Sequence, residues 1–308
     1  MRHHLILYLI LLCIFGLSYT YCDAQFTNPH RTSGFQRAVD GLIKKTQAKD
    51  LQPASRYEVI LDSAESCASR HDFNGAAEWY RKALREKPSS PLNDKIFSNL
   101  GICLTHTGAI REALEAFDIA LVRNPDSPEI LTSRASAYIV VQDYSEAIKD
   151  LDSALAADPN YSPALSLRGR LHLTNGNLEL ASADFIELRS TDPRNSWGYS
   201  GVGRILFSQG NYDEALQMLR KGMELENDPE TVLTLILCLM EKNRLAEASD
   251  IINEQISLNP REPDLYIARA LLRRNLYLIQ EAEEDFKTAQ RLGADPTLIA
   301  ELKKEQKK

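Results

Sequence analysis

Residues 111–125 read REALEAFDIALVRNP, and residues 145–159 read SEAIKDLDSALAADP. Each stretch places an alanine, Ala113 or Ala147, four residues before a large apolar residue and twelve residues before a proline. Apolar residues recur along both stretches with the period of an amphipathic helix. Because proline lacks a backbone N–H and clashes with the preceding turn, it ends that helix. The two stretches therefore predict two copies of one helical unit.

The same unit recurs along most of the chain. Its alanine is found seven times, at Ala76, Ala113, Ala147, Ala181, Ala215, Ala248 and Ala282. Successive spacings are 37, 34, 34, 34, 33 and 34 residues. A second small residue, alanine or glycine, lies twelve residues before this alanine in six of the seven copies. We therefore predict seven repeats, which run from Tyr57 to about Asp295.

Each repeat is predicted to hold two helices joined by a turn. Turn-forming residues separate the two helical stretches, as at Asn74-Gly75, Thr107-Gly108 and Asn175-Gly176. The two small residues allow a pair of antiparallel helices to approach closely, and the large apolar residue fills the space beside that contact. One such pair cannot bury its apolar face alone, whereas stacked pairs form a continuous core.

These features together resemble the tetratricopeptide repeat, in both its period and its pattern of small, aromatic and proline positions. The resemblance covers residues 57–295 of the 308. It implies an all-α fold, a right-handed superhelical solenoid of stacked antiparallel helix pairs with helical caps. It also implies protein–protein scaffolding, because the family as such carries no chemistry. Departures from the pattern occur in the fifth and sixth repeats, at Gly222, Asn227, Ile236 and Gln255.

Four segments are expected on this basis. They are a signal peptide (1–24), an N-terminal segment with a capping helix (25–56), the repeats (57–295), and a C-terminal capping helix with a basic tail (296–308). Caps are expected because terminal repeats would otherwise expose apolar faces. We interpret the lysine-rich tail, residues 303–308, as the solvated end of the last helix, with contact to an anionic membrane as the alternative.

The N-terminus has the layout of an export signal. A short polar start is followed by the apolar run Leu5–Leu17, which is too short to span a bilayer comfortably. Small and polar residues follow up to Ala24, so cleavage is expected there, with Gln25 as the first mature residue. Two alternatives stay open: an uncleaved membrane anchor, and lipid attachment at Cys22.

Composition and motifs argue against catalysis and nucleic-acid binding. The formal net charge of −7 opposes binding to a polyanion. The sequence contains no nucleophile elbow, no H-E-x-x-H zinc motif, no phosphate-binding loop and no dinucleotide fingerprint. The histidines lack metal-ligand spacing. We therefore expect no enzyme activity, no cofactor and no metal site.

Three cysteines remain after the expected cleavage: Cys67, Cys103 and Cys238. An odd, widely spaced set does not form a disulfide framework. Cys103 and Cys238 occupy the same repeat position, which indicates small buried thiols that fill one packing slot.

Charged residues replace apolar ones inside three repeats. We number each repeat from its first residue, which is Tyr57, Asp94, Pro128, Ser162, Ser196, Pro229 or Pro263. Position 7 is arginine and position 23 is aspartate in the third, fourth and seventh repeats only. These residues are Arg134 with Asp150, Arg168 with Asp184, and Arg269 with Asp285. Since a buried guanidinium needs a carboxylate partner, we predict a structural ion pair within each of these repeats.

The family resemblance also implies a site for a partner. In this family, positions 2, 5, 9 and 12 of the first helix line a concave groove. The candidates at these positions are Trp197, Ser166, Ser200, Arg170, Arg204 and Phe207. Small hydroxyls would leave the groove floor open, and two cations beside aromatic residues would anchor an extended, acidic segment. In the alternative interpretation, Trp197 and Phe207 pack against neighbouring helices and the arginines are solvated.

The sequence thus favours an exported, non-catalytic scaffold or adaptor of a cell envelope, periplasmic or secreted, whose partner is a protein or peptide. A lipid-anchored assembly factor of an outer-membrane or secretion machine is the second hypothesis. Membrane association is expected only if the signal is uncleaved or Cys22 is acylated. The sequence sets no oligomeric state.

Overall fold

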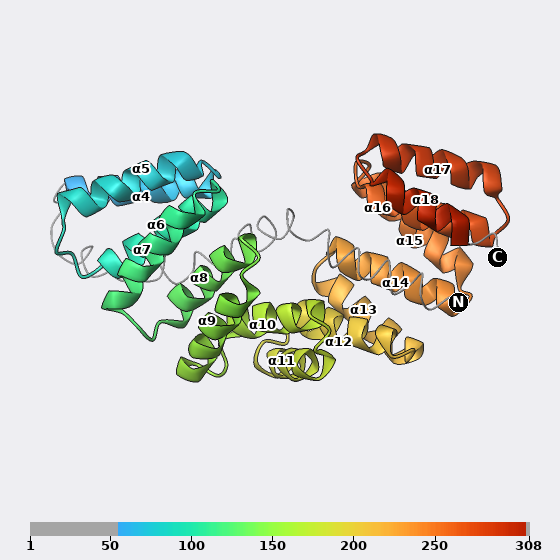
Figure 1. Cartoon of the computed structure of the whole chain (residues 1–308), viewed down its shortest axis with the longest axis horizontal. Helices are drawn as coiled ribbons and strands as arrows, with labels where there is room; N and C mark the ends of the chain where they lie inside the picture. The colour runs from blue at the N-terminus through green and yellow to red at the C-terminus, as the bar shows by residue number, and fades with distance from the viewer. Residues whose placement is uncertain (1–54, 306–308) are drawn as a thin grey trace. The chain divides into compact units, whose positions relative to one another are not determined.

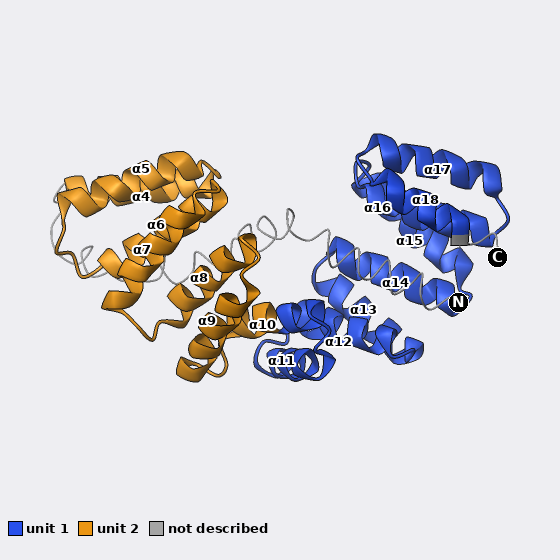
Figure 2. Cartoon of the chain, viewed as in Figure 1, with its two compact units in different colours: residues 1–15, 169–308 blue, residues 16–168 orange. Residues whose placement is uncertain are grey.

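The computed structural model describes residues 55–305, in which all regular secondary structure is α-helical (Figure 1). The chain divides between Arg168 and Gly169 into two compact units (Figure 2). The expected signal peptide, Cys22, most of the N-terminal segment and the last three residues lie outside the described part. The prediction of an all-α chain built from helix pairs is confirmed. The count of seven repeats and the segment boundaries stay predictions.

The unit that precedes Gly169 consists of consecutive helix pairs. Its helices are α4 (Arg56–Ser69), α5 (Phe73–Glu86), α6 (Asn93–His106), α7 (Ile110–Arg123), α8 (Pro128–Val140) and α9 (Tyr144–Ala157), and α10 (Ser162–Thr174) contains the boundary. Helix α4 packs against α5, α6 against α7, and α8 against α9. Each pair also packs against the next through α5 with α6 and α7 with α8.

The unit from Gly169 onward repeats this arrangement and ends in a single helix. Its helices are α11 (Leu178–Thr191), α12 (Trp197–Ser208), α13 (Tyr212–Leu225), α14 (Pro229–Glu241), α15 (Leu245–Leu258), α16 (Pro263–Asn275), α17 (Ile279–Arg291) and α18 (Pro296–Glu305). Helix α18 packs against α17, and its residues Ile299 and Leu302 are buried in the last hydrophobic cluster. This helix thereby covers an apolar face of the α16–α17 pair.

The alanines that define the repeat lie in the core. Six of the seven are fully buried, and Ala282 is 1% exposed. The large apolar residue four positions later is buried beside them, as at Phe117, Phe185 and Phe286. The three helices α8, α14 and α16 begin at a proline. Proline is tolerated there because N–H groups in the first turn of a helix make no intrahelical hydrogen bond.

The turn between the two helices of a pair has one recurring geometry. Its second residue, position 15 of the repeat, has φ between 57° and 79°. The seven residues at this position are His71, Gly108, Gln142, Gly176, Gly210, Asn243 and Tyr277. Left-handed backbone suits glycine and asparagine and is strained for bulky residues. The expected turn at Asn74-Gly75 is wrong, because both residues lie inside α5 and the turn falls at residues 70–72, which end at the N-cap Asp72.

Two of the departures from the repeat pattern have local explanations. Asn227, which stands where other repeats have proline, donates a hydrogen bond from Nδ2 to Oε1 of buried Gln255 at 3.0 Å. Gly222 lies against Ser200 of α12, where an added Cβ would meet the Ser200 Cβ at 2.9 Å. Each change therefore fits a specific neighbour.

The three cysteines within residues 55–305, Cys67, Cys103 and Cys238, are free and buried, as their spacing predicts. Burial raises the pKa of the Cys103 thiol to about 12, and that of Cys238 to about 12. Because only the thiolate is nucleophilic, the folded chain is expected to leave both residues unmodified by iodoacetamide at pH 8. Peptide mass spectrometry after brief alkylation, with and without denaturant, measures this. Rapid modification of Cys103 or Cys238 in the folded chain would contradict it.

Candidate functional site

Two arginines approach one tryptophan in the unit from Gly169 onward. The guanidinium carbon of Arg170, on α10, lies 4.0 Å from the centroid of the Trp197 ring, and that of Arg204, on α12, lies 5.6 Å from it. Both arginines are buried, at 7% and 8% exposure, whereas Trp197 is half-buried. Two desolvated cations at one indole ring form a cation–π cluster of the kind that contributes most when water is excluded.

A carboxylate pairs with one of these arginines. Nη1 of Arg204 donates to Oε2 of Glu230, on α14, at 2.6 Å, and the Glu230 side chain is 16% exposed. Burial raises the pKa of Glu230, and the nearby charges of Arg204 and Arg170 oppose that rise. Arg170, Trp197, Arg204 and Glu230, hereafter the Arg–Trp cluster, therefore lie together on three helices.

Local packing fixes the tryptophan at the start of α12. The backbone N–H of Trp197 donates to Oδ1 of Asn195 at 3.1 Å, and the Trp197 ring stacks on Phe185 with centroids 6.4 Å apart. Gly198 and Gly201 bring α12 close to α11, because an added Cβ would meet the Arg189 backbone at 3.0 Å and the Phe185 ring at 2.5 Å respectively. Glycine at both positions therefore sets where the Trp197 ring lies.

The structure brings only three of the six partner-site candidates together, namely Arg170, Trp197 and Arg204. Phe207 is 2% exposed and packs beside Tyr212 in the core. Ser200 is 1% exposed and faces Gly222 of α13, and Ser166 is buried in the unit that precedes Gly169. The arginines, in turn, are buried and not solvated as the alternative interpretation supposed.

Glu230 was missed by the sequence reasoning, although a signal for it exists. It occupies position 2 of the sixth repeat, the same position that Trp197 occupies in the fifth. Its partner Arg204 lies 26 residues earlier, in the preceding repeat. Comparing groove positions between neighbouring repeats, and not within one, would have found it.

The predicted ion pairs form within two of the three repeats as described. Arg134 donates from Nε and Nη2 to the two carboxylate oxygens of Asp150 at 2.8 and 2.6 Å. Arg269 binds Asp285 in the same two-point manner at 3.0 and 2.7 Å. Both aspartates are buried. Arg168 donates to Asp152 at 2.7 Å, and its pairing with Asp184 stays a prediction.

Each of these arginines also contacts the preceding repeat, at a position that sequence reasoning overlooked. The acceptor is position 25, which is Asp118 for Arg134, Asp152 for Arg168 and Asn253 for Arg269, at 2.6, 2.7 and 3.1 Å. Where the next repeat lacks the arginine, position 25 is Arg81, Ile186 or Arg220. The acceptor therefore accompanies the arginine of the following repeat, and this covariation is visible in the sequence.

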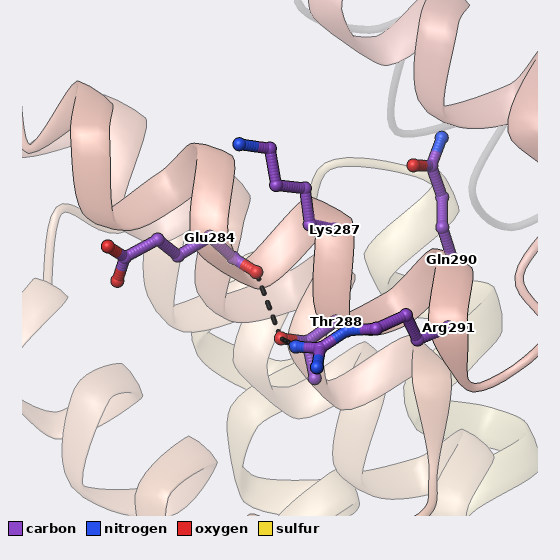
Figure 3. Close-up of a pocket in the computed structure, with 5 residues that line it drawn as sticks. All are labelled: Glu284, Lys287, Thr288, Gln290 and Arg291. Atoms are coloured by element: carbon purple, nitrogen blue, oxygen red, sulfur yellow. Dashed lines mark hydrogen bonds between the residues drawn. The ribbon is translucent and has the colours of Figure 1, made fainter.

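The structure offers little else that resembles a site for chemistry. A shallow hollow along α17 is lined by side chains of that helix alone, which carry mixed charge (Figure 3): Glu284, Lys287, Thr288, Gln290 and Arg291. Residues 55–305 contain no group of three or more histidine, cysteine or acidic side chains that could hold a metal ion. No helix in the same range has the length and hydrophobicity needed to cross a membrane.

Comparison with family models finds one kind of repeat. Two models, both described as tetratricopeptide repeat, match the chain: one at residues 206–272, the other at residues 106–162 and 166–230. None of the curated proteins matches the chain.

Solved structures share the fold. A tetratricopeptide repeat protein from Parabacteroides merdae ATCC 43184 is 26% identical with a TM-score of 0.63, over 80% of this chain and 96% of the other. The hetero-tetramer Cut9–Hcn1 of the APC/C is 14% identical with a TM-score of 0.63, over 90% and 58%. Pseudomonas aeruginosa pilF is 17% identical with a TM-score of 0.60, over 69% and 97%. The solenoid class predicted from the repeats is confirmed.

Proposed function

Because this chain carries tetratricopeptide repeats, a fold that commonly mediates protein–protein interaction, we propose that it is a non-catalytic scaffold or adaptor of a cell envelope. Its ligand is an extended segment of another protein that carries an acidic group. The segment binds on the first helices of the fourth to sixth repeats, at the Arg–Trp cluster.

The geometry of the Arg–Trp cluster carries this proposal. Arg170, Trp197 and Glu230 lie at positions 9, 2 and 2 of consecutive repeats, on first helices that line the groove in this family. Trp197 stays half-buried, and two guanidinium groups lie at its ring. A ligand carboxylate would accept charge-assisted hydrogen bonds from these cations. Tryptophan and arginine are also the residues most enriched among binding hot spots.

The envelope location rests on the N-terminal sequence. A polar start, the apolar run Leu5–Leu17 and a small residue at Ala24 have the order of a secretory signal. The second candidate, a lipid-anchored assembly factor, rests on Cys22. The intact mass of the mature protein separates the candidates, because one form begins at Gln25 and the other at an acylated Cys22. A mature chain that still begins at Met1 would contradict both and favour the uncleaved anchor.

Neutralising the Arg–Trp cluster is expected to abolish partner capture. The triple change Arg170→Met, Arg204→Met and Glu230→Gln removes the donors together with the Glu230 charge that pairs with Arg204, so that carboxylate is not left unpaired. Loss of two charge-assisted hydrogen bonds should weaken binding by on the order of a hundredfold or more. The measurement is capture from an envelope extract on the immobilised chain, followed by titration of the captured protein.

The matched control is the double change Arg123→Met and Arg261→Met, which removes two exposed arginines elsewhere. It should bind as the parent does, and thermal melting should show that all variants fold. Equal binding by the triple variant would place the partner on another face. Failure of the parent to capture any protein would count against the scaffold itself.

A further inference from the structure

One arginine of α11 donates a hydrogen bond to a methionine of α13. Nη1 of Arg189 lies 3.5 Å from Sδ of Met218, and the Arg189 guanidinium carbon lies 6.0 Å from the centroid of the Tyr199 ring. Arg189 and Met218 are both half-buried, so solvent reaches the pair. A thioether is a weak acceptor, whereas a guanidinium group forms its strongest hydrogen bonds with charged or strongly polar oxygens. The contact therefore sets a strong donor beside a weak acceptor.

The repeat pattern shows what usually stands at these two positions. Arg189 occupies position 28, which is apolar in five other repeats and glutamine in the seventh: Leu84, Leu121, Leu155, Met223, Ile256 and Gln290. Met218 occupies position 23, where the third, fourth and seventh repeats have aspartate. In the third and seventh repeats that aspartate accepts two hydrogen bonds from an arginine, as Asp150 does from Arg134. Position 23 is thus a place where this fold accommodates an oxygen acceptor for a guanidinium group.

We propose that Met218 is a site of reversible oxidation by peroxide, and that Arg189 binds the methionine sulfoxide that results. The sulfur lone pair attacks one oxygen of hydrogen peroxide, so that an S–O bond forms and the O–O bond breaks. Sulfur loses two electrons, and the departing hydroxide takes the remaining proton of the attacked oxygen to become water. The new oxygen is a stronger acceptor for Arg189 than the thioether, and sulfoxide reductases can remove it. This modification is independent of partner binding at the Arg–Trp cluster.

The expected consequence is a gain of stability, which is the reverse of what oxidation does to a methionine in an apolar core. At Met223 and Met240, which pack against hydrophobic clusters, a sulfoxide would place a polar oxygen among apolar side chains and cost stability. At Met218 the same oxygen meets a cationic donor from a neighbouring helix. Helices α11 and α13 both pack against α12, and the contact from Arg189 to Met218 joins them directly. Oxidation of Met218 therefore strengthens the contact between these helices.

The first test compares the oxidised and reduced full chain with Met218 as the one methionine left in residues 55–305. Met223→Leu and Met240→Leu remove the other two at nearly constant volume. After treatment with hydrogen peroxide, mass spectrometry of the tryptic peptide 205–220, which contains Met218, measures the conversion. We expect oxidation to raise the melting temperature by about 2 °C. In the same chain with Arg189→Leu, which places the usual apolar side chain at position 28, oxidation should lower it.

Two further variants assign the cause. Met218→Leu in the same background has no sulfur at position 23, so peroxide should leave its melting temperature unchanged, which excludes effects of oxidation at the cysteines or Met1. Met218→Gln supplies an amide oxygen without any oxidant, and it should melt higher than Met218 when Arg189 is present and lower with Arg189→Leu. A shift that is the same whichever residue stands at 189, zero included, would overturn the proposal. So would a folded chain in which peroxide leaves Met218 unmodified.

Discussion

Arg134→Ala is expected to lower the free energy of unfolding by about 3 kcal/mol or more, among the largest effects of any single change to a charged residue in this chain. Most of this lost stability comes from Asp150, the carboxylate that Arg134 pairs with. Asp150 has a side chain only 8% exposed, and both its oxygens accept from Arg134. Without the guanidinium, a buried carboxylate loses its counter-charge and two hydrogen bonds, and no water replaces them at low cost. Urea unfolding followed by circular dichroism measures the change.

Two controls distinguish the cost of leaving Asp150 buried and unpaired from the cost of losing an exposed ion pair. Arg81→Ala removes an arginine that also binds a neighbouring repeat, at Glu112, but both side chains are at least one-third exposed, so the cost should stay below about 1 kcal/mol. Replacing both members, as Arg134→Met with Asp150→Leu, should restore most of the stability. If Arg134→Ala unfolds at the same urea concentration as the parent, the pair is not a stabilising element.

Gly201→Ala is expected to destabilise the chain by about 2 kcal/mol or more, although alanine is the better helix former by about 1 kcal/mol. The reason is space. A Cβ at residue 201 would lie 2.5 Å from the Phe185 ring, and that ring is held between the backbone of α12 and the stacked Trp197 ring. Neither the ring nor the helix can move without disturbing the start of α12.

Helix propensity favours alanine at residue 201 and packing against Phe185 disfavours it, so the sign of the stability change shows which effect is larger. Thermal and urea unfolding of Gly201→Ala give the net effect. Gly201→Ala combined with Phe185→Leu should be more stable than the sum of the two single changes predicts, because the shorter side chain makes room for the added methyl. A more stable Gly201→Ala variant would mean that the α11–α12 contact relaxes freely and that glycine at residue 201 does not position Trp197.

The repeat pattern predicted the helices because their positions depend on local and periodic features. Small residues at helix contacts, such as Ala113 and Ala147, and prolines after the second helix recur at fixed spacing. The misplaced turn at Asn74-Gly75 shows the limit of this reasoning. Asparagine before glycine favours a turn, yet Asp72 caps the N–H of Gly75 at 2.9 Å and begins α5 earlier. Capping by one side chain decided between two local preferences.

The candidate site was harder to predict because its contacts join different repeats. Arg170 and Arg204 were identifiable as cations at groove positions, but their burial depends on Trp197 and Glu230 from adjacent repeats. Periodicity within a repeat carries no information on whether position 12 faces the groove or the core, and Phe207 faces the core. Pairwise comparison of neighbouring repeats contains the missing information.

The position-25 contacts also constrain how such a chain can be rearranged. Repeat proteins change by duplication and loss of whole units, which preserves each hairpin but creates new neighbours. Loss of the second repeat would set Arg81 in the place of Asp118, opposite Arg134, and loss of the sixth would set Arg220 in the place of Asn253, opposite Arg269. Both events would bring like charges together at a junction between repeats. The charges at these junctions thus restrict which repeats can be lost, because some shortened chains would place two arginines opposite each other and fold less stably.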